Sequence, residues 1–197
     1  MEEEVLVISR DHFEKIGAFA GFKTFDRDWY LQLIDEKAFQ FRQRKSVEED
    51  PEYKQLIPYL IFRYHDLLFY YRRSKKGSER RLASLRSIGI GGHINRHDET
   101  TGNVYRSGMQ RELNEEVEIS PIVEESIIGF IYDPTIYVGT LHLGIAHQFI
   151  LEEPTACSRE EAIIDTGWET IDQLWNQREE FETWSQLVLE HLRRDHS

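Results

Sequence analysis

The sequence predicts one α+β domain with a mixed sheet, and three observations lead to that fold class. Runs rich in β-branched and aromatic residues recur along the chain, but they do not alternate regularly with helical segments. No linker separates the 197 residues into two folding units. Hydrophobic residues make up 40% of the composition, which is enough for a packed core.

Residues 1–50 are expected to form an N-terminal addition with some helix. Within it, residues 5–9 predict a short strand and residues 10–18 a helix. Residues 22–41 predict helix plus loop, and residues 42–53 predict a polar loop.

Residues 55–73 predict a hairpin, because two β-rich runs flank a tight turn at residues 64–66. A polar loop, SKKGSERR, follows this hairpin. Residues 82–90 then lead into a pair of glycines, Gly91 and Gly92.

The second half of the chain predicts three further strands and two helices. The strands are expected at residues 127–132, 138–151 and 167–170, and the first of them is stopped by an Asp-Pro pair. Thr170 is expected to cap a brief helix. Residues 178–195 predict an amphipathic helix as a C-terminal addition.

Charge and cysteine content narrow the function classes. The formal net charge of −12 disfavours a nucleic acid polymer as partner, because such a protein needs a basic surface. A small anionic substrate remains compatible, since a bound cation can invert the local field. Cys157 is the single cysteine, which fits a reducing cytosol. No signal peptide and no apolar run of about 18 residues is present, so we expect a cytoplasmic protein without a membrane partner.

The stretch from residue 91 to 119, GGHINRHDETTGNVYRSGMQRELNEEVEI, carries the candidate chemistry. With residues 103–117 helical and capped by Asn103, three glutamates share one helix face: Glu112, Glu115 and Glu116. Three like charges on one face repel, and a hard divalent cation such as Mg²⁺ or Mn²⁺ removes that penalty.

Arg111 lies one helical turn before Glu115 and can orient a carboxylate by bidentate pairing. Gly92 allows a ligand to approach its backbone closely, so its carbonyl could join a metal shell. Taken separately, an acidic helix is usually a solvated face and a glycine pair is usually a turn. Their combination in one stretch favours a site.

These residues resemble the Nudix box, G-x5-E-x7-R-E-U-x-E-E-x-G-U, where U is a bulky apolar residue. Residues 111–117 match R-E-U-x-E-E-x, Ile119 matches the last apolar position, and Gly92 matches the opening glycine. The runs SIGIGGHIN, VGTLHLGIAH and ETWSQLVLEHL look like a little-characterised bacterial Nudix branch of predicted phosphoesterases.

The resemblance implies a Nudix-fold α/β/α sandwich and a hydrolase that cleaves the phosphoanhydride bond of a nucleoside diphosphate linked to another group. It implies Mg²⁺ or Mn²⁺ as cofactor, held by Glu112, Glu115, Glu116 and the Gly92 carbonyl. The same glutamates and Arg111 would be the catalytic residues, and the family pattern does not say which carboxylate is the general base.

Two departures from the box are visible. Counting from Gly92, the first box glutamate falls at Asp98, and twelve residues rather than seven then precede Arg111. Counting backwards from Arg111 places Asn103 there instead, so the carboxylate that pairs with this arginine stays undecided. Glu118 replaces the late glycine, so we expect the end of the helix to differ from the family pattern.

Substrate-binding candidates lie outside the three glutamates. Arg72 and Arg81 belong to a dense basic cluster that either clamps substrate phosphates or forms a solvated hairpin end. His93 follows the glycine pair and could donate to a phosphate. His142 and His147 are expected on opposite faces of one strand.

Other side chains are candidates with ordinary structural alternatives. Glu160 and Glu161 could supply an extra carboxylate or belong to a solvated loop. Tyr137, Trp168 and Trp175 could stack on a base or pack in the core.

The leading expectation is therefore an enzyme that acts on a small nucleotide-type diphosphate. The rival from another class is a non-catalytic Nudix-like module that binds a nucleotide as a sensor or regulator. A scaffold protein with an acidic helix and no ligand would require the box match to be chance. The sequence leaves a homodimer open.

Overall fold

The computed structural model describes residues 2–73, 85–99, 102–159 and 163–195. Its residues group into two compact units, each assembled from three separate stretches of chain. The first unit comprises Met1–Pro58, Gly91–Glu112 and Ile127–Ala146, and the second comprises Tyr59–Ile90, Leu113–Ser126 and His147–Ser197. The organisation as a single domain stays a prediction.

One large sheet dominates the described residues, with its main strands hydrogen-bonded in the order β12-β5-β4-β10-β9-β2. A separate two-stranded sheet pairs β11 with β8. No helix among the described residues is long and apolar enough to cross a membrane. The strands are β1 Glu4–Ser9, β2 Gly21–Thr24, β3 Gln40–Gln43, β4 Tyr53–Tyr64, β5 Leu67–Arg73, β6 Arg86–Ser87, β7 Gly89–Ile90, β8 Val117–Ile119, β9 Ile122–Tyr132, β10 His142–Leu151, β11 Ala156–Ser158 and β12 Ile163–Thr170.

The helices are mostly short and are capped by side chains that the sequence supplies locally. Ser9 caps α1, Asp26 caps α2 and Thr170 caps α6, each accepting a hydrogen bond from a backbone N–H of the first turn. The bounds are α1 Arg10–Lys15, α2 Arg27–Leu33, α3 Arg44–Val47, α4 Val104–Glu116, α5 Tyr137–Thr140, α6 Ile171–Asn176 and α7 Thr183–Asp195, with 3-10 turns at Glu36–Ala38, Arg96–Asp98 and Arg178–Glu180.

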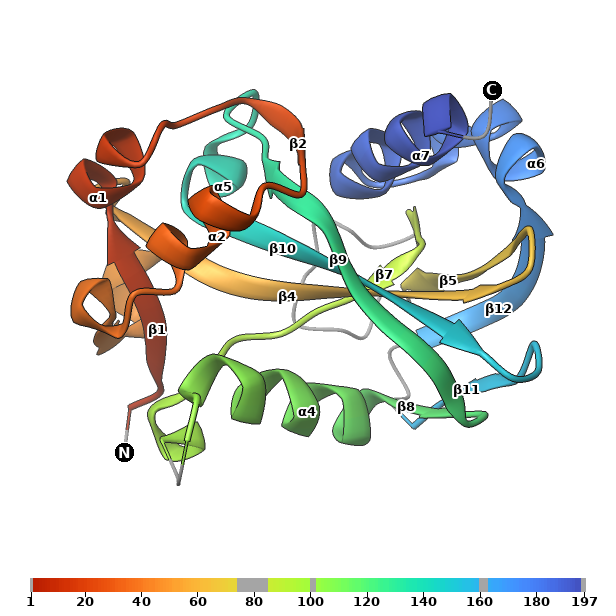
Figure 1. Ribbon diagram of the computed structural model, residues 1–197, viewed down its shortest axis with the longest axis horizontal. Helices are drawn as coiled ribbons and strands as arrows, with labels where there is room; N and C mark the ends of the chain where they lie inside the picture. The colour runs from red at the N-terminus through yellow and green to blue at the C-terminus, as the bar shows by residue number, and fades with distance from the viewer. Residues whose placement is uncertain (1, 74–84, 100–101, 160–162, 196–197) are drawn as a thin grey trace. The chain divides into compact units, whose positions relative to one another are not determined.

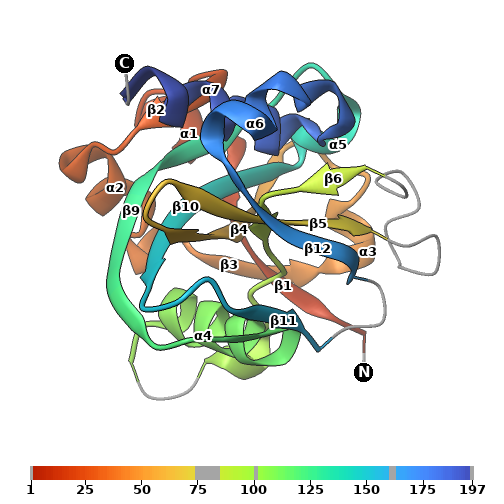
Figure 2. The same cartoon turned by 90° about the vertical axis from the view of Figure 1, so that its right-hand side faces the viewer.

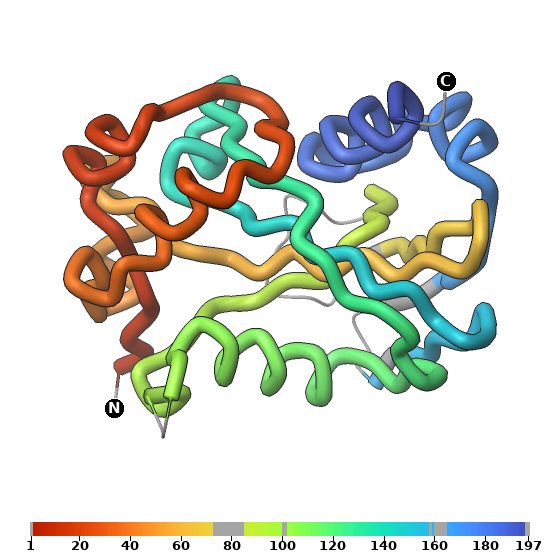
Figure 3. The backbone as a smooth tube through the Cα atoms, viewed as in Figure 1, coloured from red at the N-terminus to blue at the C-terminus, as the bar shows by residue number. Residues whose placement is uncertain are grey.

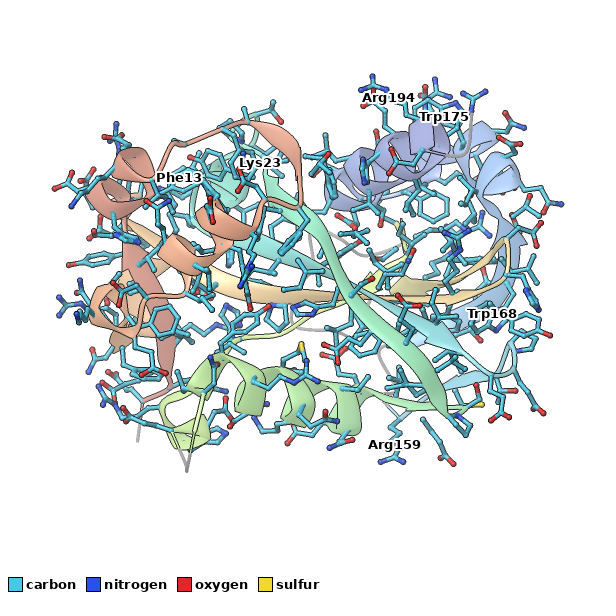
Figure 4. All side chains as sticks on the ribbon, in the orientation of Figure 1. Phe13, Lys23, Arg159, Trp168, Trp175 and Arg194 are labelled. Atoms are coloured by element: carbon cyan, nitrogen blue, oxygen red, sulfur yellow. The ribbon has the colours of Figure 1, made fainter. Side chains whose placement is uncertain are left out.

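In the first unit, the prediction for residues 22–53 was wrong in part. Strand β2 pairs antiparallel with the end of β9, and β3 pairs with β1. Each strand forms on a partner remote in sequence, which local patterns do not reveal. The predicted loop also contains α3. The aromatic residues pack together around Phe13 of α1, labelled in Figure 4, whose ring lies near those of Trp29 and Tyr132.

In the second unit, the predicted hairpin is confirmed. Strands β4 and β5 pair at Tyr64 and Leu67 across a two-residue turn, in which His65 has a φ of 52°. The turn between β4 and β5 can be followed along the tube in Figure 3. Strand β12 pairs along β5, and α6 and α7 pack against each other (Figure 2).

The prediction of one long strand over residues 138–151 was wrong at its start. Residues Tyr137–Thr140 form the turn α5, and β10 begins only at His142. Gly139 explains the turn, because a Cβ there would lie 1.9 Å from the Asp133 carbonyl oxygen. The chain therefore folds back on itself between β9 and β10.

Candidate functional site

Helix α4 carries the predicted acidic face and is drawn in Figure 1 as one uninterrupted helix. Asn103 caps it as predicted, because its side-chain oxygen accepts a hydrogen bond from the Arg106 N–H at 2.9 Å. Met109 and Leu113 are buried and anchor the helix by an apolar stripe. Glu116 follows Met109 by two helical turns, so the buried glutamates lie beside the apolar stripe and not on a separate face, which corrects the expectation of one face for the core and another for chemistry.

The three box glutamates differ in their exposure. Glu112 is 8% exposed and Glu116 is 9% exposed, whereas Glu115 faces solvent. Glu112 and Glu116 are separated by one helical turn, so their side chains leave the same side of α4. Burying two ionised carboxylates on one side of a helix lowers the stability of the fold unless cations or hydrogen-bond donors compensate their charge.

The loop before α4 decides which carboxylate pairs with Arg111, the point that residue counting left undecided. The Arg111 guanidinium donates from Nε to Asp98 Oδ1 at 2.8 Å and from Nη2 to Asp98 Oδ2 at 3.0 Å. It also donates to the His93 carbonyl at 2.9 Å and to Glu112 at 2.7 Å. Arg111 thus connects the loop, the segment after the glycine pair and one box glutamate.

Asp98 is fixed for this role by its own local structure. It ends the 3-10 turn Arg96–Asp98, and its Oδ2 accepts the Asn95 N–H at 2.7 Å. Burial by itself would raise the pKa of Asp98, but the Arg111 bonds and the Asn95 N–H outweigh it, so the pKa lies below its ordinary value. The carboxylate is therefore ionised when it holds Arg111.

Gly92 lies directly against the Glu112 carboxylate. A Cβ added at Gly92 would be 2.1 Å from Glu112 Oε2, so only glycine leaves this carboxylate its present position. Gly91 is constrained from another side, since a Cβ there would be 2.5 Å from the Pro58 carbonyl oxygen. The glycine pair is thus required by the close approach of other protein atoms rather than by an unusual backbone angle, and the approach of a ligand to the Gly92 backbone stays a prediction.

The helix ends without the glycine that the family pattern places at position 118. α4 passes at Glu116 straight into β8, where Glu118 pairs with Cys157 of β11. An extended residue needs no left-handed backbone angle, so a glutamate is accommodated there. Val117, expected within the helix, therefore belongs to a strand, where it is buried.

His93 is a buried, neutral histidine, and its role in substrate binding stays a prediction. Burial chiefly, and then the positive charges of Arg44, His142 and Arg111, hold its pKa well below the ordinary value. Its Nε2 is buried and has no hydrogen-bond partner among the described residues. Its ring centroid lies 5.8 Å from that of His142.

The remaining candidates are placed as follows. Arg72 pairs with Asp165 and Glu180, both at 3.3 Å, so its role as a phosphate clamp stays a prediction. Arg81, Glu160 and Glu161 lie outside the described residues.

The aromatic candidates have other contacts. Tyr137 is exposed, and Trp168 packs against Phe69 with 5.6 Å between ring centroids. Trp175 lies under the guanidinium groups of Arg178 and Arg193. Both tryptophans are labelled in Figure 4.

The donor chemistry of α4 fits a hard divalent cation. Among the described residues, no three carboxylate, imidazole or thiol side chains are arranged as a preformed metal cage. Magnesium commonly takes one or two carboxylates and completes its shell with water and substrate phosphates. Two buried glutamates one turn apart, with glycine backbone against one of them, would fit such a partial shell, and their role as metal ligands stays a prediction.

Comparison with known proteins adds independent evidence on the family and the fold of the chain. No family model matches the chain. It is 31% identical to Protein YmaB of Bacillus subtilis (strain 168), in an alignment 205 positions long that covers 98% of this chain and 98% of YmaB. The solved structure of Tm1382, a protein assigned to the Nudix hydrolases, superposes with a TM-score of 0.80 at 27% identity, over 96% of this chain and 98% of Tm1382.

A third similarity concerns the fold alone. The Nudix domain of Shewanella oneidensis NrtR, solved in complex with ADP ribose, has a TM-score of 0.55 at 13% identity, over 88% of this chain and 100% of that domain. With the Tm1382 likeness, this confirms the predicted α/β/α fold class.

Proposed function

Because the chain belongs to the Nudix hydrolase superfamily, we propose that it hydrolyses the phosphoanhydride bond of a nucleoside diphosphate linked to another group, with Mg²⁺ or Mn²⁺ as cofactor. One observation carries the proposal: Glu112, which begins the acidic face of α4, lies against Gly92 and accepts a hydrogen bond from Arg111. The box residues from both ends of the inserted loop thus come together.

The ligands we propose are Glu112, Glu115, Glu116 and the Gly92 carbonyl; Glu112 and Glu116 would form the partial shell, and the exposed Glu115 side chain would have to turn towards the cation to join them. When bound, it would supply neutralisation of the diphosphate charge and activation of the attacking water. A protein with a net charge of −12 needs such a counter-charge to accept a polyanionic substrate.

Arg111 has a positioning role in this proposal. Three of its donors are engaged by Asp98 and the His93 carbonyl, and a fourth reaches Glu112. The guanidinium therefore orients the Glu112 carboxylate and stays protonated throughout. The general base is one of the glutamates, and Glu115 is the exposed one that water reaches freely.

The experiment replaces Glu115 and Glu116 together with glutamine. We expect loss of Mg²⁺-dependent hydrolysis across a panel of nucleoside diphosphate derivatives, and loss of Mn²⁺ binding measured by electron paramagnetic resonance. The melting temperature should stay near that of the wild type, because glutamine keeps the volume of both side chains.

Glu118→Gln is the matched control, since Glu118 is an exposed glutamate in the same stretch but lies on β8. It should keep full activity. A wild-type protein that binds nucleotides with Mg²⁺ or Mn²⁺ and hydrolyses none of them would refute the enzyme and favour the non-catalytic nucleotide-binding module.

A further inference from the structure

Strand β9 is longer than the strand that covers its outer edge. β9 begins at Ile122, before residue 127 where the sequence predicted its start, and Figure 1 draws it as one continuous strand. On one side it neighbours β10, and on the other side β2 pairs only with residues 129–132. Among the described residues, no strand pairs with residues 122–126 on that outer side. The start of β9 is therefore an open sheet edge of the second unit.

Two hydrogen bonds show which backbone groups point to this open edge. The Phe25 N–H, just after β2, donates to the Ile128 carbonyl at 3.0 Å, so the backbone groups of Ile128 point outwards. The Glu152 N–H, just after β10, donates to the Pro121 carbonyl at 3.0 Å, so that carbonyl points inwards. Successive residues of a strand alternate in this direction, and the two bonds agree on the alternation. Three residues therefore direct their N–H and C=O groups outwards: Ile122, Glu124 and Ser126.

The side chains along this edge are apolar and acidic. Ile122 is 42% exposed and Val123 is 68% exposed, and no other large hydrophobic side chain is exposed in the described part of the second unit. Glu124 is exposed as well, and the Glu125 carboxylate lies 3.4 Å from Nδ1 of His147. Because side chains alternate between the two faces of a strand, each face of the edge carries one aliphatic and one acidic side chain.

The chain around this edge is acidic and has no basic residue to balance it. The sequence contains no lysine or arginine between residues 112 and 158. Two more exposed glutamates, Glu152 and Glu153, lie beside the residues that precede β9, since the Ser120 hydroxyl donates to the Glu153 carbonyl at 2.8 Å. A second copy of the chain paired at this edge would bring like charges together, which disfavours self-association. A basic segment would be attracted instead.

We propose that residues 122–126 of β9 bind an extended, basic segment of another protein, which adds to the sheet as a further strand. The outward N–H and C=O groups would bond to the backbone of this segment. A lysine or arginine of the partner would pair with Glu124, and its aliphatic side chains would cover Ile122 and Val123. The interaction is separate from hydrolysis, because none of these residues belongs to the Nudix box.

The test uses the full chain and a synthetic peptide, acetyl-Thr-Val-Lys-Ile-Lys-Val-Thr-amide. A twin peptide carries methyl groups on the backbone nitrogens of its two central residues, the first lysine and the isoleucine. Adjacent residues of a strand point to opposite edges, so the two methyl groups block both edges of the peptide without changing its charge. At low ionic strength, we expect the twin to bind at least about tenfold more weakly in calorimetry.

Variants of the protein test the same edge from the other side. Ser126→Pro removes one outward N–H without changing the charge, and proline is tolerated in an edge strand where its nitrogen faces solvent. Ser126→Ala is the matched control, because it removes the hydroxyl and keeps the N–H. Ser126→Pro should weaken binding of the unmethylated peptide about three- to tenfold, and Ser126→Ala should leave it unchanged.

A charge reversal separates local from global electrostatics. Glu124→Lys should weaken binding of the peptide about tenfold or more. Glu179→Lys changes the net charge by the same amount at a glutamate whose side chain is 87% exposed in the turn Arg178–Glu180. It should alter the affinity by less than about twofold. Equal losses in the two variants would mean that the peptide responds to net charge alone, which would overturn the proposal.

Amide hydrogen exchange measured by NMR locates the peptide on the strand. In the free protein, the N–H groups of Ile122, Glu124 and Ser126 should exchange fast, and those of Val123 and Glu125, which point to β10, should exchange slowly. The peptide should slow the fast set.

Three further results would overturn the proposal. They are equal affinities of the two peptides, equal effects of Ser126→Pro and Ser126→Ala, and slow exchange of the outward N–H groups in the free monomer. A dimer of the free protein that Ser126→Pro dissociates, detected by sedimentation, would assign the edge to a second copy and exclude the basic partner.

Discussion

Replacing Gly92 with alanine should remove activity while leaving the protein folded. The added Cβ would lie 2.1 Å from Oε2 and 2.3 Å from Cδ of Glu112, far inside contact distance. The group it meets is the end of a flexible side chain, so the clash is relieved by rotation of Glu112 rather than by a shift of the backbone. The substitution therefore acts on a proposed metal ligand without touching it chemically.

The stability cost of this change should be small. Displacing Glu112 breaks its 2.7 Å hydrogen bond with Arg111, which costs about 1.5–3 kcal/mol for a charged pair. Arg111 keeps its bonds to Asp98. Alanine also lowers the conformational entropy of the unfolded chain, which stabilises the folded protein by about 0.4–1 kcal/mol. We expect a net loss of about 1–2 kcal/mol and a drop in kcat/KM of roughly 10–100-fold, as for other disturbed metal shells.

The assay measures Mg²⁺-dependent hydrolysis and urea unfolding for Gly92→Ala beside Gly102→Ala. Gly102 has a φ of +111°, and a Cβ there would meet no described atom within 4 Å. Its replacement should cost about 1–3 kcal/mol through backbone strain and leave kcat/KM unchanged. Full activity in Gly92→Ala, or a loss of activity that merely follows unfolding in both variants, would refute the reasoning.

Two further predictions concern residues around Asp98, and a third concerns a buried hydrogen-bond network of the second unit. Asp98→Glu restores the family residue but should lower the free energy of unfolding, measured by urea titration, by about 1–3 kcal/mol. The buried Asp98 carboxylate is already in contact with α4, so the longer glutamate side chain would be overpacked. A stabilised variant would contradict this. Gly108→Ala should also lower the melting temperature although helix propensity favours alanine by about 1 kcal/mol, since the added Cβ would lie 2.7 Å from Asp98 Oδ2. Burial first, and then the Glu182 charge, raise the pKa of Tyr59 well above 10.0; the neutral phenol therefore stabilises the fold below pH 10, and this contribution falls as the pH rises beyond it. Tyr59→Phe should cost about 1–3 kcal/mol at pH 7 by removing the 2.7 Å donor to Glu182, and its stability measured between pH 9 and 11 should fall less steeply than that of the wild type.

Features that depend on neighbouring residues could be predicted from the sequence. The caps at Asn103 and Thr170 are satisfied within one turn of helix, so their signals are complete locally. The hairpin at residues 64–66 is equally local, since its two strands pair with each other. Strands β2 and β3 were missed because their partners, β9 and β1, are distant in the chain.

The sequence by itself determined the acidic face of α4 and the family to which the protein belongs. The spacing of Glu112, Glu115 and Glu116 is a property of any helix, so it needs no tertiary information. Counting residues could not show which carboxylate pairs with Arg111. The loop carries an insertion, so its path in three dimensions, and not the number of residues, decides which side chain reaches the guanidinium.

The tertiary structure alone decided that Asp98 fills this role, with bonds of 2.8 and 3.0 Å to the guanidinium. It also decided that Gly92 contacts Glu112, and that the start of β9 at Ile122 has no strand on its outer side among the described residues. An open edge looks in sequence like any other strand. It becomes visible only when the neighbouring strands are in place.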